Sequence, residues 1–297
     1  MFSTELVVQT FISGVMIGVL YALMALGITF IYSIMRMINW AMGEFYMIGS
    51  YLQYMLVAWL LGPDLWWLAI LISTAGVFVL GLFTEWSLLK PIFSKPPEVR
   101  GDYATVVTLA LLLMLRSLAT GIAGPNQFTP GSNLPIVMVG PMPMAGARVA
   151  AFVFALAALG VFWAVLRYTW YGLALRATSQ SRVGVQTAGI DVLRVDRVAF
   201  GIGVALAGLA GALLAPVFLV FPTNGLVTTV KGFEIVVIGG LGSIPGALIA
   251  GVALGLVESF GAAFVDSAYQ NIYGFALVLL ILVLRPNGLF GERGREA

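Results

Sequence analysis

The chain has 297 residues, of which 61% are hydrophobic and only 9% are charged, and its mean hydropathy is +1.03. Soluble domains carry about a quarter charged residues, so the composition excludes an ordinary soluble domain and indicates an integral membrane protein. The absence of cysteine and histidine excludes thiol nucleophiles, zinc clusters and histidine-based acid–base catalysis, and a net charge of +2 is too small to indicate binding to nucleic acid.

Long apolar runs predict an all-α, polytopic bundle of transmembrane helices. The runs are too long for the roughly ten-residue alternating strands of a membrane barrel, and a helix satisfies its own backbone groups in lipid. A span needs about 20 apolar residues, which favours about eight to ten spans in a single domain over residues 1–297. The candidate spans are 6–33, 44–61, 66–84, 103–123, 148–167, 196–217, 233–262 and 268–285.

Loop charge sets the direction of these spans, because Lys and Arg near span ends are retained in the cytoplasm. Loop 85–102 is basic and is expected in the cytoplasm, whereas loop 124–147 has no charged residue and is expected outside. Loop 168–195 is also basic and has no membrane-crossing pattern. It predicts a short cytoplasmic helix that is displayed to a soluble partner.

Small residues in loop 168–195 recur at helical spacing, which predicts one helix face suited to close approach by a partner. The alternative is a merely solvated loop between two spans. The residues near the predicted face are Ala177, Ser181, Gly184, Val185 and Ala188.

The C-terminal tail carries Arg285, Arg293 and Arg295, so it is expected in the cytoplasm as well. That placement requires two crossings within the apolar stretch 233–262. Residues 234–246 are apolar but contain four glycines and a proline. We therefore expect a short, interrupted crossing there, followed by a separate span near 247–262.

The first half of the chain has a comparable interruption. Residues 37–46 join two apolar helices and place Asn39, Gly43 and Glu44 at the junction. Glycine-interrupted apolar segments in both halves indicate a substrate path in transporters. The residues predicted to line that path or its gate are Asn39, Glu44, Arg116, Gly239, Gly240, Gly242, Ser243 and Pro245.

Each of these predictions has an alternative. Glu44 either binds a substrate ammonium or stabilises a helix start, where the dipole favours an anion. Asn39 either contacts substrate or bonds exposed backbone at the break, and the glycines serve close helix packing or a flexible gate. Arg116 contacts a substrate carboxylate, pairs within the bundle or snorkels to the interface. Pro245 is expected to free a backbone carbonyl, which a water-lined path would satisfy.

Three segments resemble the signatures of one permease family. Met37-Ile-Asn-Trp-Ala-Met-Gly-Glu44, continued by Phe-Tyr-Met-Ile-Gly-Ser50, looks like the first signature of permeases that import branched-chain amino acids. Gly239-Gly-Leu-Gly-Ser-Ile-Pro-Gly246 is similar to the second signature, and Leu284-Arg-Pro-Asn-Gly-Leu-Phe-Gly291 is similar to the usual close. Over nearly its whole length, the chain thus resembles the LivH-type membrane subunit of an ATP-binding cassette importer.

This resemblance implies an assembly in the inner membrane of a bacterium. Its partners would be a related second permease, two cytoplasmic ABC ATPases and an extracytoplasmic substrate-binding protein. The chain has no GxxxxGK[ST] phosphate loop, so the partner ATPases would use the ATP and this chain would bind no cofactor. The resemblance makes loop 168–195 the segment that couples to the ATPase. Its predicted coupling residues are Arg176, Ala177, Gln180, Arg182 and Gly189.

The cargo stays open at this point, because related permeases import urea and short amides, and others take organic acids. A rival of another class is a secondary transporter driven by an ion gradient, in which Glu44 would relay protons. An intramembrane enzyme is disfavoured, since the chain lacks His, Cys and a nucleophile–base pair. We therefore expect a permease with no catalytic residue and no bound metal.

Overall fold

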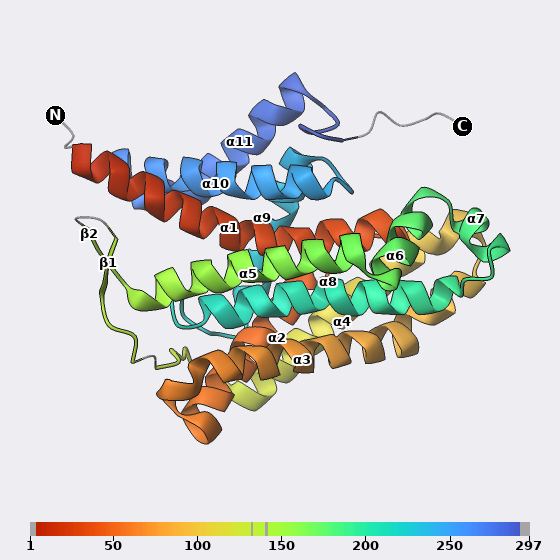
Figure 1. Cartoon of the computed structure of the whole chain (residues 1–297), viewed down its shortest axis with the longest axis horizontal. Helices are drawn as coiled ribbons and strands as arrows, with labels where there is room; N and C mark the ends of the chain where they lie inside the picture. Colours follow the sequence, from red (N-terminus) through yellow and green to blue (C-terminus); the bar gives the residue numbers. More distant parts are fainter. Residues whose placement is uncertain (1–3, 132, 140–141, 292–297) are drawn as a thin grey trace.

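The structure is a computed structural model that describes residues 4–131, 133–139 and 142–291. Its regular structure is almost entirely helical, and its long helices lie side by side (Figure 1). In chain order the helices are α1 Thr4–Met35, α2 Met42–Met55, α3 Trp66–Thr84, α4 Pro97–Ala123, α5 Gly146–Tyr168, α6 Trp170–Gln180, α7 Arg182–Thr187, α8 Val192–Leu214, α9 Asn224–Gly239, α10 Ile244–Phe264 and α11 Gln270–Leu284. π-helical turns at Leu56–Leu61 and Glu85–Leu89 continue α2 and α3, and strands β1 Val137–Val139 and β2 Met142–Met144 form a hairpin.

In the part of the chain that the structure describes, seven helical segments are long and apolar enough to cross a membrane. They are Thr4–Met35, Pro63–Phe93, Glu98–Ala123, Gly146–Tyr168, Val192–Leu214, Ile244–Phe264 and Ser267–Leu284. α2 has 14 residues and is continued to Leu61 by the π-helical turn, whereas α9 has 16 residues, which is shorter than a full span. The prediction of an all-α, polytopic membrane protein is confirmed.

The predicted interrupted crossing at 234–246 is wrong in its bounds. α9 begins at Asn224 and ends at Gly239, a turn follows, and α10 begins at Ile244. Hydropathy misses the first half of α9 because polar residues are interspersed there among apolar ones. Its residues Asn224, Thr229 and Lys231 are buried inside the bundle, so they do not meet lipid.

The helices α1 and α8 form the centre of the bundle, with 83% and 72% of their apolar windows buried. α10 packs along α1 at Gly18, where an added Cβ would lie 2.6 Å from the Cα of Val252. α3 packs along α8 at Gly208, where a Cβ would lie 2.7 Å from the side chain of Val77. Small residues let helix backbones approach closely, which favours helix association in lipid.

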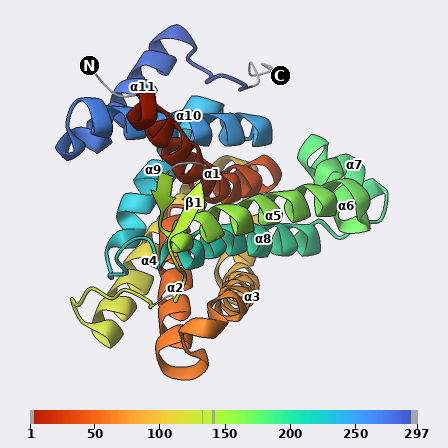
Figure 2. The same cartoon turned by 60° about the vertical axis from the view of Figure 1, so that its left-hand side comes forward.

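The helices α2 and α9, which carry the two predicted interruptions, run across the direction of α5 and α8 (Figure 2). They meet near their N-termini. There the backbone N–H of Gly43 donates a hydrogen bond of 3.0 Å to Thr229 Oγ1. The first interrupted segment therefore meets the N-terminal half of α9 at a helix crossing inside the bundle, whereas the second interruption lies at the other end of α9.

The two basic loops lie at the same end of the bundle. α6 and α7 project there beyond the end of α5 (Figure 1), and the guanidinium of Arg182 lies 5.2 Å from the ring centroid of Phe93. The hairpin of β1 and β2, from the uncharged loop, lies at the opposite end. This arrangement agrees with the orientation predicted from loop charge.

Candidate coupling segment and translocation path

The segment predicted to couple to an ATPase, residues 168–195, contains two short helices. α6 begins after Thr169, whose Oγ1 accepts a hydrogen bond of 3.0 Å from the Gly172 N–H. α7 begins after Ser181, whose Oγ accepts one of 3.1 Å from the Gly184 N–H. Such caps satisfy backbone donors that a helix start leaves free, so each hydroxyl defines where a helix begins.

The break at Ser181 corrects the prediction of a single helix face. Ser181 has φ −154° and ψ 107°, which is extended backbone, so α6 and α7 do not share one helical register. Val185 is buried, whereas Gly184 and Ala188 are exposed. The spacing of small residues predicted one helix. It does not reveal that the Ser181 hydroxyl bonds the backbone that follows it, which separates α6 from α7.

Four of the predicted coupling residues lie on the outer surface of this segment. Arg176 and Gln180 are exposed on α6, and Ala177 is half-buried. Gly189 follows α7 with φ +81°, and a Cβ built there would meet no atom within 4 Å. A positive φ favours glycine, so Gly189 serves the turn that ends α7. Contact of this surface with an ATPase stays a prediction.

Arg182 takes a different position from the one predicted. Its guanidinium turns into the bundle and forms an ion pair with Asp196 of α8, with Nη1 3.1 Å from Oδ1. The same Nη1 donates a hydrogen bond of 3.0 Å to the backbone carbonyl oxygen of Ile34 in α1. Arg182 is therefore an internal connection between α7, α8 and α1, and its contact with an ATPase stays a prediction.

The second signature forms the turn between α9 and α10. Gly240 and Gly242 have φ of +97° and +84°, the region that favours glycine. Ser243 Oγ accepts a hydrogen bond of 3.1 Å from the Gly246 N–H and so caps α10. Pro245 lies in the first turn of α10, where the helix needs no N–H from it. This position corrects the prediction that Pro245 frees a carbonyl inside a broken span.

The C-terminal signature packs on the same turn. The Leu289 N–H donates a hydrogen bond of 2.8 Å to the Ile238 carbonyl oxygen, and the Phe290 N–H donates one of 3.0 Å to that of Gly239. A Cβ on Gly240 would run into the backbone of this tail. Gly239 and Gly240 therefore permit close packing at the turn, and their role in a gate stays a prediction.

Asn39 bonds the backbone at the break between α1 and α2. Its side chain is 1% exposed. Oδ1 accepts a hydrogen bond of 3.0 Å from the Ala41 N–H, and Nδ2 lies 3.5 Å from the Met42 sulfur. Asn side chains often bond their own backbone two residues on. The structure therefore favours the backbone-bonding interpretation of Asn39.

Glu44 lies in the first turn of α2 and is 0% exposed. Neither carboxylate oxygen has a hydrogen-bond partner among the described residues. Oε2 lies 2.9 Å from the position of a Cβ built on Gly225, near the start of α9. The carboxylate thus faces the N-terminal turns of two helices, whose dipoles favour negative charge. This arrangement supports the helix-start interpretation of Glu44.

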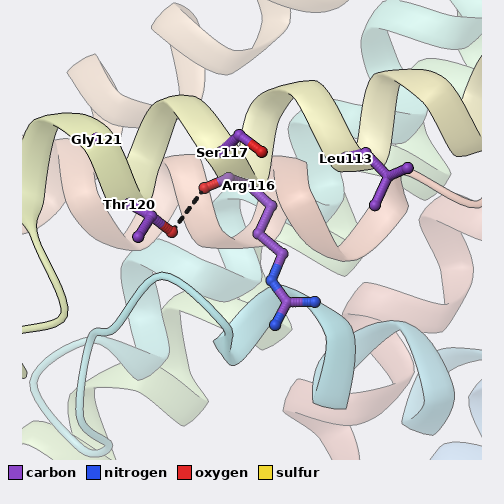
Figure 3. Close-up of a pocket in the computed structure, with 5 residues that line it drawn as sticks. All are labelled: Leu113, Arg116, Ser117, Thr120 and Gly121. Carbon is purple, nitrogen blue, oxygen red and sulfur yellow. Dashed lines mark hydrogen bonds between the residues drawn. The ribbon is translucent and has the colours of Figure 1, made fainter.

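Arg116 extends from α4 away from the helix (Figure 3). The Thr120 hydroxyl donates a hydrogen bond of 2.9 Å to the Arg116 carbonyl oxygen, so the hydroxyl has its partner within the same helix. No ion pair among residues 4–131, 133–139 and 142–291 includes the guanidinium. It borders a cavity of about 520 Å³ along this face of α4. The guanidinium attracts the buried Glu44 carboxylate electrostatically, beyond the distance of an ion pair. It also borders the cavity, and charge that faces lipid is costly, so this face suits a partner subunit or an aqueous path. The cavity is lined by Leu113, Arg116, Ser117, Thr120 and Gly121.

Comparison with known proteins agrees with the three signatures. A family model described as "Branched-chain amino acid transport system / permease component" matches residues 10–284. The chain belongs to this permease family. It is 33% identical to the permease protein LivH of Escherichia coli strain K12, over 96% of the chain and 95% of the relative. It is 29% identical to the permease protein BraD of Pseudomonas aeruginosa, over the same shares of 96% and 95%. No solved structure matches the chain.

The permease is also similar to a second type of relative. Its identity to the permease protein LivM of Salmonella typhimurium is 26%, over 91% of the chain and 67% of LivM. LivH and LivM are both described as permease proteins of a high-affinity branched-chain amino acid transport system. Two distinct relatives of this permease thus belong to transport systems of the same kind.

Sequence reasoning did not identify Lys231 as the cation that pairs with carboxylates in a buried charged cluster of the permease. Lys231 of α9 forms ion pairs with Glu258 of α10 and, at 3.4 Å, with Glu234 of α9. The Tyr21 hydroxyl of α1 donates a hydrogen bond of 3.2 Å to Glu258. The i,i+3 spacing of Lys231 and Glu234 is a weak signal for a pair. The contact with Glu258 depends on the approach of α9 and α10, which the sequence does not reveal.

Proposed function

We propose that this permease is the membrane subunit of an ATP-binding cassette importer for branched-chain amino acids in the inner membrane of a bacterium. In this proposal it provides half of the translocation path and pairs with a second, related permease. Two cytoplasmic ATPases and an extracytoplasmic binding protein complete the assembly. Membership of the permease family, and similarity to both LivH and LivM, support this proposal.

The observation that carries the proposal is the connection between the α6–α7 segment and the core of the bundle. Arg182 joins α7 to Ile34 of α1 and to Asp196 of α8. Ser33 lies beside the α9–α10 turn, since a Cβ on Gly242 would lie 3.9 Å from the Ser33 Cα. A displacement of α6 and α7 therefore reaches α1, α8 and the signature turn through direct contacts.

The geometry suits a machine driven from outside the chain. When ATP brings the two ATPases together, they would move the exposed surface of α6 and α7. The central helices α1 and α8, which Arg182 connects to this segment, would move with it. The two permeases would then tilt against each other and open the path on alternate sides of the membrane. The permease needs little affinity for cargo, because the binding protein selects it and a tight site in the path would slow release.

The test begins with an affinity pull-down of the tagged permease from gently solubilised native membranes, followed by mass spectrometry. We expect stoichiometric recovery of an ATPase and a second permease. The recovered assembly, reconstituted with its binding protein, is then expected to take up leucine only with ATP. Recovery of this chain alone in a complex that transports with an ion gradient would overturn the importer. ATP-dependent uptake of urea in place of leucine would support the ATP-driven importer and contradict branched-chain amino acids as its cargo.

A further inference from the structure

A cavity of about 440 Å³ lies between α1, α9, the segment that follows α8 and the start of α11. This volume is within the range of small-molecule sites, which are mostly apolar with a few convergent polar groups. Leu20 of α1 and Phe218 after α8 contribute to its apolar wall. Its polar lining includes Tyr21, Asn224, Thr228, Lys231 and Gln270.

One end of the cavity has an excess of negative charge. Lys231, which lines the cavity, is paired with both Glu258 and Glu234. The three residues are only 7%, 1% and 5% exposed. Two carboxylates share one ammonium, so the ionised cluster has a net charge of −1. Glu234 Oε1 accepts no hydrogen bond from any described residue. Buried charge without compensation is costly, and a cationic ligand would offset it.

The polar groups at this end offer hydrogen-bond acceptors to the cavity. The Tyr21 hydroxyl and Gln270 Nε2 each donate a hydrogen bond of 3.2 Å to Glu258 Oε2. With the Tyr21 O–H and one Gln270 N–H used, the Tyr21 oxygen and Gln270 Oε1 remain as acceptors, and the second Gln270 N–H remains as a donor. The adjacent negative charge strengthens the two acceptors.

Asn224 adds a separate acceptor to the same cavity. Its Nδ2 donates to Ser50 Oγ at 3.4 Å, which orients the amide. Its Oδ1 is buried and has no partner among the described residues. Asn224 and Lys231 are seven residues apart on α9, so both lie on one face about 10 Å apart. Asn224 Oδ1 and Glu234 Oε1 are the buried atoms of α9 without a partner among the described residues, and both are acceptors, which points to a ligand that donates. The third N–H of Lys231 is a remaining donor on the same helix.

We propose that this cavity binds the protonated amino group of the transported amino acid, with Tyr21 and Gln270 as its hydrogen-bond acceptors and Glu258 as the charge behind them. The identity of the cargo rests on the proposed function. A primary ammonium has three N–H donors and matches this set of acceptors, whereas urea and organic acids lack a cationic donor. An aliphatic side chain packs on the apolar wall near Leu20 and Phe218.

Glu44, the residue predicted from sequence to bind the ammonium, is less suited to it. Glu44 does not line the cavity. A Cβ on its neighbour Gly43 would run into the carbonyl oxygen of Gly225, so α2 and α9 are in close contact beside it. Access to Glu44 requires these helices to separate. Glu258 instead lies behind the wall of an existing cavity.

The absence of cysteine allows a single introduced thiol to report occupancy of the cavity. Thr228→Cys places a thiol on its wall, and Gln127→Cys, exposed in the loop after α4, is the control. The rate of maleimide labelling is measured in the full importer with cysteine-free partner subunits. The probes are leucine, isopentylamine without the carboxylate, and 4-methylpentanoate without the amino group. We expect the two amines to slow labelling of Thr228→Cys alone, and 4-methylpentanoate to have no effect.

Two further variants test the acceptors. Glu258→Gln is expected to weaken protection by leucine at least about tenfold. Gln270→Leu removes one acceptor without changing any charge, and it keeps the proposal testable if Glu258→Gln does not fold. Protection by 4-methylpentanoate equal to that by leucine would overturn the proposal, as would undiminished protection in a folded variant. If the thiol reacts with maleimide only after a bound lipid is removed, the cavity holds lipid and the proposal is overturned. If isopentylamine protects but the importer takes up no leucine, the ammonium site is supported and the proposed cargo fails.

Discussion

The guanidinium of Arg182, at the start of α7, donates a hydrogen bond of 3.0 Å to the backbone carbonyl oxygen of Ile34, in the last turn of α1. Carbonyl groups at a helix end have no partner within the helix, so a side chain of the α6–α7 segment satisfies one of them. The same guanidinium pairs with Asp196, which is fully buried in α8. One residue therefore connects this segment to the two central helices.

Arg182→Ala is expected to destabilise the permease and to abolish ATP-driven uptake, because it leaves Asp196 buried without its partner. Removing one member of a buried ion pair costs about 3–5 kcal/mol. We expect the low end of that range, since 29% of the Arg182 side chain is exposed. Thermal unfolding of the detergent-solubilised permease and leucine uptake by the reconstituted importer are the two measurements.

The double variant Arg182→Ala/Asp196→Asn separates stability from coupling. It removes the buried charge and is expected to recover most of the lost stability, but not the hydrogen bond to Ile34. Return of uptake together with stability would show that Arg182 has a structural role only.

The long helices could be predicted from sequence because each is defined by an uninterrupted apolar run. The predicted spans 66–84 and 148–167 correspond to α3, Trp66–Thr84, and α5, Gly146–Tyr168. The first half of α9 could not be predicted in this way. Residues such as Lys231 are polar, and they are buried only because they form ion pairs with other residues of the bundle. Hydropathy reports contact with lipid, and it fails where a helix is surrounded by protein.

The site was predictable where a residue acts on its own backbone and not where it acts across the fold. Glycines 240 and 242 predicted an interruption, though not that it is a turn between two helices, and a local backbone bond was one of the two interpretations of Asn39. Arg182 lies 14 residues from Asp196 and 148 from Ile34, and an arginine in a basic loop gives no sign of an inward direction. Its position follows from how α7 packs against α1 and α8.

Gly189→Asn is expected to leave the stability of the permease almost unchanged and to reduce copurification of the ATPase and uptake. Asn tolerates the left-handed region, and a side chain at Gly189 meets no atom of this chain within 4 Å. Any loss must therefore come from a partner that needs this surface. Gly131→Asn is the control, because Gly131 is exposed in the loop after α4 and a Cβ there would also meet no atom within 4 Å. Full copurification with Gly189→Asn would contradict docking at this position.

Gly240→Ala is expected to destabilise the permease more than Gly242→Ala. Both positions have positive φ, so each alanine costs about 1–2 kcal/mol in backbone strain. At Gly240 the Cβ would also lie 2.6 Å from the Gly291 Cα, whereas at Gly242 the nearest atom is a ring carbon of Tyr32 at 3.5 Å. Overpacking adds about 1–3 kcal/mol at Gly240 alone. Thermal unfolding measures the difference, and equal effects would contradict tight docking of the C-terminal signature on the turn.

Glu44→Gln is expected to keep leucine uptake and to raise the thermal stability of the permease. Neither oxygen of the buried carboxylate has a hydrogen-bond partner in the described chain, so the amide removes the cost of burying a charge. The variant loses about 1 kcal/mol of favourable interaction with the two helix N-termini and the longer-range attraction of the Arg116 guanidinium, which together we expect to be smaller than the cost of burying the charge. Glu258→Gln is the comparison, because it changes the same group at the cavity and is expected to lower uptake. If Glu44→Gln folds and binds the ATPase but no longer transports leucine, the charge of Glu44 acts on cargo or protons. The helix-start interpretation would then be insufficient.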